Sequence, residues 1–144
     1  MRVRINNLIE QRKKLQEKFR KEITVSPRDI TVTSIDEQLV QRAIAAVEKN
    51  ISNPKFDTSG MAKEVGISRM LLNTKLKALT GLPTGEFIRT LRLKRAAQLL
   101  KQDYGNVTQV AYEVGFQSLS YFAKAFRKQY GQSPSHYLLQ YKND

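Results

Sequence analysis

The stretch Ala111–Phe116, AYEVGF, decides the fold because the chain contains it twice. The other copy is Ala62–Ile67, AKEVGI, which lies 49 residues earlier. In both copies an alanine suits the close crossing of two helices, and a glycine can adopt the positive φ that a sharp turn requires. Each stretch therefore predicts a helix that ends at a tight turn, with a second helix beyond it.

The two copies also match beyond the turn, after a slip of one residue. The positions that pair at an offset of 50 residues are Leu72 with Phe122, Leu76 with Phe126, Lys77 with Arg127, Gly81 with Gly131 and Phe87 with Tyr137. Large apolar side chains four residues apart seat the second helix of each copy on the first. This arrangement is a helix-turn-helix, and the outer face of its second helix is free to enter a major groove.

Capping residues and helix breakers divide the chain into further helices. Ser34 and Glu37 match a capping box that starts a helix, and Asn53–Pro54 stop it. Later helices are expected over 58–65 after a cap at Asp57 or Thr58, 69–80 after Ser68, 84–101, 106–114, 118–130 and from Pro134 onward, with Gly66, Gly81, Gly115 and Gly131 ending the four short ones. Since no segment of 34–144 alternates like a strand, the predicted fold class is all-α.

The long helix over 84–101 joins the two copies. Six of its apolar residues recur at core spacing, namely Phe87, Ile88, Leu91, Ala96, Leu99 and Leu100. At about 1.5 Å per residue, such a helix spans roughly 27 Å. We therefore expect a linker helix that holds two recognition helices near the ~34 Å repeat of successive major grooves.

The balance of charged residues points to a polyanionic partner. The chain has 25 Lys+Arg against 13 Asp+Glu, which gives a formal net charge of +12. Such an excess favours nucleic acid first and an anionic membrane second, and a generally basic soluble surface is the plainer alternative. There is no apolar run long enough to span a membrane, no secretory signal pattern and no cysteine. A reducing, cytoplasmic setting is the simplest interpretation.

The N-terminal segment forms a separate region. One narrow apolar stripe runs along residues 1–23, and it consists of Ile5, Leu8, Leu15 and Phe19. The stripe, which Arg12 interrupts, suits either a weak homodimeric coiled coil or a helix that packs on a neighbour or frays. Pro27 and alternating β-branched residues then predict an extended linker. We therefore place a domain boundary between 1–33 and 34–144.

The second copy resembles the signature of the AraC/XylS family of bacterial transcription regulators. Residues 111–137, AYEVGFQSLSYFAKAFRKQYGQSPSHY, fit A-x-x-V-G-F, then S-Y-F-x-K-x-F-[RK]-[RK], then G-x-S-P-x-x-Y. The resemblance covers about 36–141 and implies a regulator that binds double-stranded DNA. One departure is Leu138-Leu139, where family members often carry a basic residue.

The segment around 5–44 is similar to the junction between a receiver domain and an AraC-type output domain in hybrid two-component regulators. This second resemblance implies upstream receiver and sensor domains in a longer parent chain, which could be anchored in the inner membrane. Met1 then need not be a native start.

By resemblance, the outward residues near the start of each recognition helix contact DNA. On the first such helix Leu72, Leu76 and Leu79 face inward, and the outward set is Ser68, Arg69, Met70, Asn73, Thr74 and Lys77. Arginine can pair with guanine, asparagine with adenine, and methionine can touch a thymine methyl group. The alternatives are that Asn73 and Thr74 are merely solvated and that Met70 is partly in the core.

The second recognition helix presents a shorter and less charged face. Phe122 and Phe126 are expected in the core, and the outward set is Ser118, Leu119, Ser120, Ala123, Lys124 and Arg127. Tyr121 stands beside the turn, where its hydroxyl either reaches a phosphate or belongs to a half-buried aromatic side chain. We therefore expect the first copy to carry more of the base specificity.

Basic residues are spread around the linker helix at Arg89, Arg92, Lys94 and Arg95, so they do not all face one phosphate backbone. For Arg92, contact with the DNA backbone and a structural ion pair with Glu64 or Glu113 are both left open.

Three rival functions remain at this point. An enzyme or a metal protein would need converging acid, base or ligand side chains, but His136 is the single histidine and the carboxylates are scattered. His136 is interpreted as a surface or capping residue, and no cofactor is expected. A sequence-tolerant architectural or RNA-binding module would need wedges or stacking aromatics, whereas the aromatics here lie at core spacing. The third rival, a module that dimerises through 1–23, is compatible with DNA binding.

Overall fold

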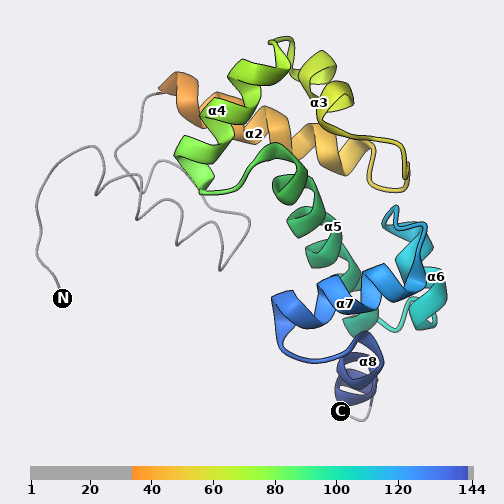
Figure 1. Ribbon diagram of the computed structural model, residues 1–144. Coiled ribbons are helices and arrows are strands. Elements are labelled where there is room, and N and C mark those ends of the chain that lie inside the picture. Colours follow the sequence, from red (N-terminus) through yellow and green to blue (C-terminus); the bar gives the residue numbers. More distant parts are fainter. Residues whose placement is uncertain (1–33, 143–144) are drawn as a thin grey trace, which may run out of the picture. The chain divides into compact units, whose positions relative to one another are not determined.

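A computed structural model describes residues 34–142, and this part of the chain contains helices and no strands. The helices are α2 (Ser34–Lys49), α3 (Thr58–Val65), α4 (Arg69–Thr80), α5 (Thr84–Lys101), α6 (Val107–Glu113), α7 (Leu119–Tyr130) and α8 (Pro134–Lys142) (Figure 1). The all-α prediction is confirmed. The expected N-terminal helix and linker, with the stripe formed by Ile5, Leu8, Leu15 and Phe19, lie outside the described residues.

The described residues form two compact units, each of which contains one helix-turn-helix. The first unit consists of 34–46 and Asp57–Phe87, and the second consists of Val47–Phe56 and 88–142. Helices α2 and α5 each contribute to both units, since α2 runs past residue 46 and α5 runs past residue 87. The expected boundary between 1–33 and 34–144 stays a prediction.

In the first unit α3 packs against α4, as the first copy of the repeat predicts. Leu72 and Leu76 of α4 are fully buried, and Leu79 is nearly so. Asp57 accepts a hydrogen bond from the backbone nitrogen of Gly60 at 3.1 Å, which caps α3. Ser68 caps α4 in the same way through the nitrogen of Leu71, at 3.1 Å. The starts of α3 and α4 are thus both fixed by side-chain caps.

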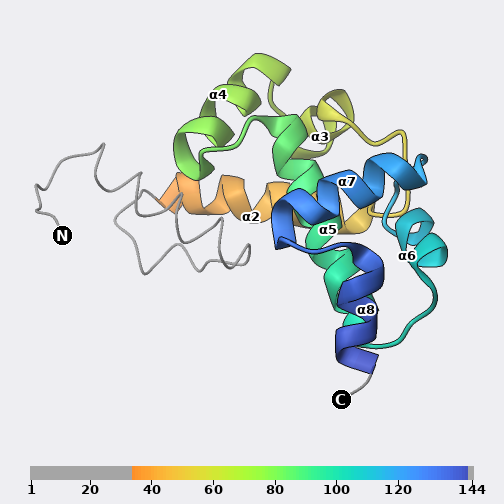
Figure 2. The same ribbon diagram turned by 60° about the horizontal axis from the view of Figure 1, so that its bottom comes forward.

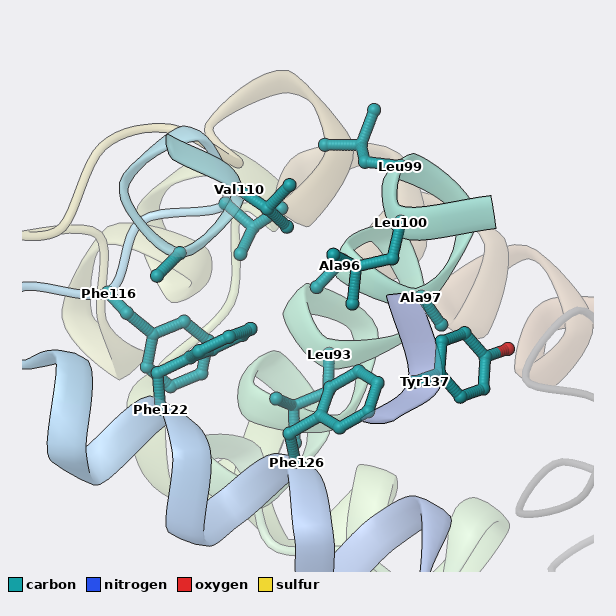
Figure 3. Packing of buried hydrophobic residues seen from close by; sticks show 12 residues of the cluster. Leu93, Ala96, Ala97, Leu99, Leu100, Val110, Phe116, Phe122, Phe126 and Tyr137 are labelled. Atoms are coloured by element: carbon teal, nitrogen blue, oxygen red, sulfur yellow. The ribbon is translucent and has the colours of Figure 1, made fainter. Parts of the chain in front are cut away.

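In the second unit α6, α7 and α8 pack on one another around an aromatic core (Figure 3). The rings of Phe116 and Phe122 meet edge to face with centroids 5.1 Å apart, and those of Phe126 and Tyr137 do so at 5.3 Å. Figures 1 and 2 both show α7 lying across the later turns of α5, which supply Leu93 and further small and branched side chains to the same core. The core therefore fixes which face of α7 points outward.

Three helices have boundaries that differ from the predicted ones. Helices α6 and α7 begin at Val107 and Leu119, one residue later than expected, because Asn106 and Ser118 are their N-caps. Helix α2 ends at Lys49, before the expected stop at Asn53–Pro54. The three residues between them, 50–52, belong to a turn in which the nitrogen of Asn53 donates to the carbonyl oxygen of Asn50 at 3.0 Å. Helix α6 ends at Glu113, one residue earlier than expected, because Val114 already forms the turn.

Candidate nucleic-acid interface

The outward face of α4 is exposed, as the sequence predicts. Ser68, Arg69, Met70, Asn73, Thr74 and Lys77 are all exposed. Met70 is 81% exposed, so the alternative that it is partly in the core is wrong. These side chains rise from a helix whose opposite face is buried, and their Cα positions are therefore fixed by the core of the first unit.

Arg69 is tied to the helix on the other side of the turn. Its Nη1 donates a hydrogen bond to Ser59 Oγ of α3 at 3.0 Å. The two residues border a groove of about 540 Å³ between the start of α3 and the start of α4, and its lining residues are Asp57, Thr58, Ser59, Arg69, Met70 and Asn73. Arg69 thus lines this groove, and its guanidinium has further donors beyond the one that bonds Ser59.

Asn73 has a partner that the sequence did not reveal. Its Oδ1 accepts a hydrogen bond from the backbone nitrogen of Thr84 at 2.9 Å, and Thr84 Oγ1 lies 3.3 Å away. Thr84 is buried at the start of α5, where backbone N–H groups lack partners within the helix. The side-chain oxygen therefore caps α5, so the alternative that Asn73 is merely solvated is wrong. Reading adenine through both amide atoms would compete with this bond.

The outward face of α7 combines small polar, apolar and basic side chains. Ser118, Leu119, Ser120, Tyr121, Lys124 and Arg127 are exposed, whereas Ala123 is partly buried. Ser118 Oγ accepts a hydrogen bond from the backbone nitrogen of Tyr121 at 3.1 Å and so caps α7. Because a hydroxyl that accepts can still donate, Ser118 keeps a donor for a phosphate oxygen. Leu119, at 39% exposure, is an apolar surface suited to a methyl group.

Tyr121 agrees in part with each of the two interpretations that the sequence left open. Its ring packs at 5.8 Å from that of Phe116, yet the side chain is 49% exposed. Its hydroxyl oxygen accepts a hydrogen bond from Arg89 Nη1 at 3.1 Å. The hydroxyl hydrogen therefore points away from Arg89 and is available to an outside acceptor. This hydrogen bond also brings Arg89 to the exposed first turn of α7. Arg89 was not among the predicted contacts.

Of the two options left open for Arg92, the ion pair with Glu64 or Glu113 is wrong. Arg92 is buried, with 6% of its surface exposed, and its guanidinium donates to four backbone carbonyl oxygens. Glu113 instead accepts a hydrogen bond from the Tyr104 hydroxyl at 3.3 Å. Burial lowers the pKa of Arg92 below its ordinary value, since desolvation disfavours the charged form. Contact with the DNA backbone, the other option for Arg92, is ruled out by the same burial.

Sequence reasoning missed the structural role of Arg42. Its Nη2 donates a hydrogen bond to the carbonyl oxygen of Val65, the last residue of α3. A weak signal was present, because Arg42 and Arg92 lie 50 residues apart, which is within one residue of the 49-residue offset that the repeat has before its turn.

Residues 34–142 contain no group of three or more His, Cys, Asp or Glu side chains that could hold a metal ion. His136 is exposed on α8, and its backbone nitrogen donates to Ser133 Oγ at 3.1 Å, which agrees with a surface position. Across the same residues, none of the helices has the length and apolar character of a membrane span.

The chain is similar to known proteins in both sequence and structure. Histidine kinase P4 of Formosa agariphila is 44% identical over 140 residues, which cover 97% of this chain and 10% of that protein. The chain thus spans about a tenth of the length of that relative. An AraC-type DNA-binding regulator from Chromobacterium violaceum has a TM-score of 0.69 and 28% identity, with 76% of this chain and 96% of that chain covered.

A solved complex with DNA is also similar. The DNA-binding domain of the global transcriptional factor AdpA, in complex with a target DNA, has a TM-score of 0.65 and 28% identity, covering 73% of this chain and 93% of that chain. Residues 61–140, more than half of the chain, match the family described as a helix-turn-helix domain. The chain therefore belongs to the AraC-type helix-turn-helix family of DNA-binding transcription regulators.

Proposed function

We propose that this chain reads a specific sequence of double-stranded DNA by inserting α4 and α7 into successive major grooves. The observation that carries the proposal is the pair of capped helices, each with an exposed first turn above a fully buried apolar face. A recognition helix needs both properties, because its N-terminal residues meet base edges while its other face holds it in the fold. The 18 residues of α5 give a spacer of about 27 Å, comparable with the ~34 Å groove repeat.

The two helices divide the task unequally. Arg69 offers the strongest base contact, since a guanidinium pairs with both acceptors of a guanine. Thr74 and Met70 add a hydroxyl and an apolar contact on the same face. On α7, Leu119 meets a thymine methyl group, whereas Ser118, Ser120 and Tyr121 bond phosphate oxygens. The first helix-turn-helix therefore supplies most of the hydrogen-bonded base recognition.

Basic side chains provide the affinity that does not depend on sequence. The chain carries a formal net charge of +12, and Lys77, Lys124 and Arg127 lie on the exposed faces of the two recognition helices. Neutralising phosphates releases condensed counterions, so binding should weaken steeply as salt is added.

The experiment that tests this function is selection of bound duplexes from a random library, followed by footprinting of the selected sequence. We expect two protected segments about one helical turn, roughly 10 base pairs, apart on one face of the duplex. Protection that slides along any duplex without a preferred sequence would favour a sequence-tolerant architectural protein instead.

We further propose that the chain is the output part of a two-component signalling protein of the cytoplasm. The likeness to a histidine kinase that is about ten times longer supports this context. An upstream domain could then act by pairing two copies, because two tethered binding units raise each other's effective concentration on a two-site operator. The isolated chain should sediment as a monomer or as a weak dimer. Residues 1–33 should hold this dimer together. A tight dimer that survives deletion of 1–33 contradicts this arrangement.

A further inference from the structure

Each helix-turn-helix is held by an arginine that lies outside it. In the first unit Arg42 of α2 donates to the carbonyl oxygen of Val65, directly before the turn glycine Gly66. In the second unit Arg92 of α5 donates from Nη1 to the carbonyl oxygen of Val114 at 2.9 Å, directly before Gly115. The two arginines lie 50 residues apart, and each donates to the carbonyl oxygen directly before a turn glycine, so the bond to the turn occurs in both units.

Arg92 donates hydrogen bonds to three further backbone carbonyl oxygens. Its Nη1 also donates to Ile51 O at 3.1 Å, while Nη2 donates to Asn53 O at 2.9 Å and to Phe56 O at 3.3 Å. These bonds use all four hydrogens on the two terminal nitrogens of the guanidinium. A lysine keeps the charge, but its donors radiate from one nitrogen and do not reproduce this planar fork.

The guanidinium of Arg92 lies at the turn between α6 and α7, and this turn sets the direction of α7. The last carbonyls of α6 have no partner within the helix and carry the negative end of its dipole, so a cation there fixes the exit of the chain. Gly115 follows with a φ of +89°, and a Cβ on it would overlap Arg92 Nη1 and stand 2.6 Å from Ile51 O. The turn therefore closes directly on the guanidinium, and α7 begins four residues later.

We propose that Arg92 is a positioning residue for the second recognition helix, and that Arg42 has the same part for the first. Each arginine sets the base readout of its own helix through the carbonyl before the turn glycine. Arg92 does so without touching DNA, since it is buried. The inference rests on the proposed function, in which each recognition helix reads its own half of the operator.

The test measures, for each variant, how strongly affinity depends on each half of the selected duplex. One half-site at a time is scrambled, and the loss of affinity relative to the intact duplex is recorded at fixed salt. The half read by α4 is identified as the one at which Arg69→Ala relaxes base preference. The variants are Arg92→Lys, which keeps the charge, and Arg42→Met, which removes the donors. The charge control is Arg95→Met, because Arg95 is exposed on α5 and donates to Gln98.

In the wild type, scrambling either half should lower affinity by about tenfold or more. Arg92→Lys should lose most of that dependence at the half read by α7 and keep it at the other half. Arg42→Met should show the reverse. Arg95→Met should lower affinity for all duplexes alike and keep both dependences. Helix content and the melting transition of every variant are followed by circular dichroism.

The outcomes separate the two proposals. A wild-type chain that is indifferent to both scrambled halves refutes the proposed function and this inference with it. A second outcome is that the wild type depends on both half-sites and a folded Arg92→Lys still depends equally on both. This result refutes the positioning role alone. If Arg92→Lys melts below the assay temperature, Arg42→Met decides, because Arg42 is bonded to a single turn carbonyl in the other unit. A loss at both halves in Arg42→Met also refutes the positioning role.

Discussion

Asn73 Oδ1, on the first recognition helix, lies 2.9 Å from the backbone nitrogen of Thr84, the first residue of α5. A residue that is expected to contact DNA thus also accepts a hydrogen bond from the backbone N–H at the start of the next helix. The bond joins the exposed face of α4, for which we propose contact with DNA, to the start of α5. Under this proposal recognition and stability are coupled at Asn73, and substitutions can separate them.

Asn73→Ala should lower the free energy of unfolding by about 1–3 kcal/mol, because the buried N–H of Thr84 loses its acceptor. Asn73→Asp should keep most of that stability, since a carboxylate accepts the same bond and suits a helix N-terminus. It should nevertheless weaken DNA binding, because the amide donor is gone and a negative charge faces phosphates. Urea unfolding and duplex titration of both variants check this. Equal stability of Asn73→Ala and the wild type would show that the bond contributes nothing.

Ser59→Ala should weaken binding to the selected duplex by about 0.5–1.5 kcal/mol, the usual cost of ordering a long side chain that is no longer restrained. The reason is that Ser59 Oγ accepts a bond from Arg69 and holds its guanidinium near the groove. Stability should change little, since both side chains are exposed. Fluorescence anisotropy with labelled duplex measures the effect. Tighter binding by Ser59→Ala would mean that the bond withdraws Arg69 from DNA.

The local geometry at three glycines should rank the effects of their substitution on the free energy of unfolding. Gly115→Ala should cost about 2–5 kcal/mol, because a left-handed backbone and a close approach to Arg92 and Ile51 O act together. Gly131→Ala has the strain of a φ of +78° but open space around the Cβ, so about 1–2 kcal/mol is expected. Gly85→Ala, inside α5 with open space, should stabilise by up to about 1 kcal/mol. Thermal and urea unfolding give the order. A Gly115→Ala variant as stable as Gly131→Ala would contradict the account of the turn.

Tyr137 should make the second unit sensitive to alkali. Burial, and then the neighbouring Tyr141, raise the pKa of Tyr137 above its ordinary value. The folded state therefore holds the proton, while the unfolded chain releases it at a pH of about 10. The stabilisation is full below that pH and is lost as the pH rises toward the folded pKa. Urea unfolding at pH 8 and above 10 should show a smaller loss for Tyr137→Phe than for the wild type. The exposed Tyr112→Phe is the control and should follow the wild-type curve.

The helices and the outward faces could be predicted because they depend on local signals. Ser68 and Asp57 cap helices whether or not the rest of the chain is known, and Gly66, Gly81 and Gly131 adopt the positive φ that ends a helix. The repeat then placed Phe122 and Phe126 in the core, where both are fully buried.

The partners of the polar side chains could not be predicted in this way. For Arg92 the sequence left open an ion pair with a carboxylate and a contact with the DNA backbone. Its acceptors are instead carbonyls at Ile51, Asn53 and Phe56, which the fold brings to it across about 40 positions of sequence. Asn73 was assigned to DNA because its spacing on α4 is outward, and spacing does not show that Thr84 lies beside it. Hydrogen bonds between distant segments depend on tertiary geometry, which periodicity leaves undetermined.

The most direct test of sequence-specific recognition compares the affinity of the chain for its selected duplex with its affinity for random duplex across a salt series. Both affinities should fall steeply with salt, because a chain of net charge +12 releases counterions on binding. At physiological salt the selected duplex should bind at least about 10³-fold more tightly than the random one. Equal affinities at physiological salt would contradict sequence-specific reading by α4 and α7.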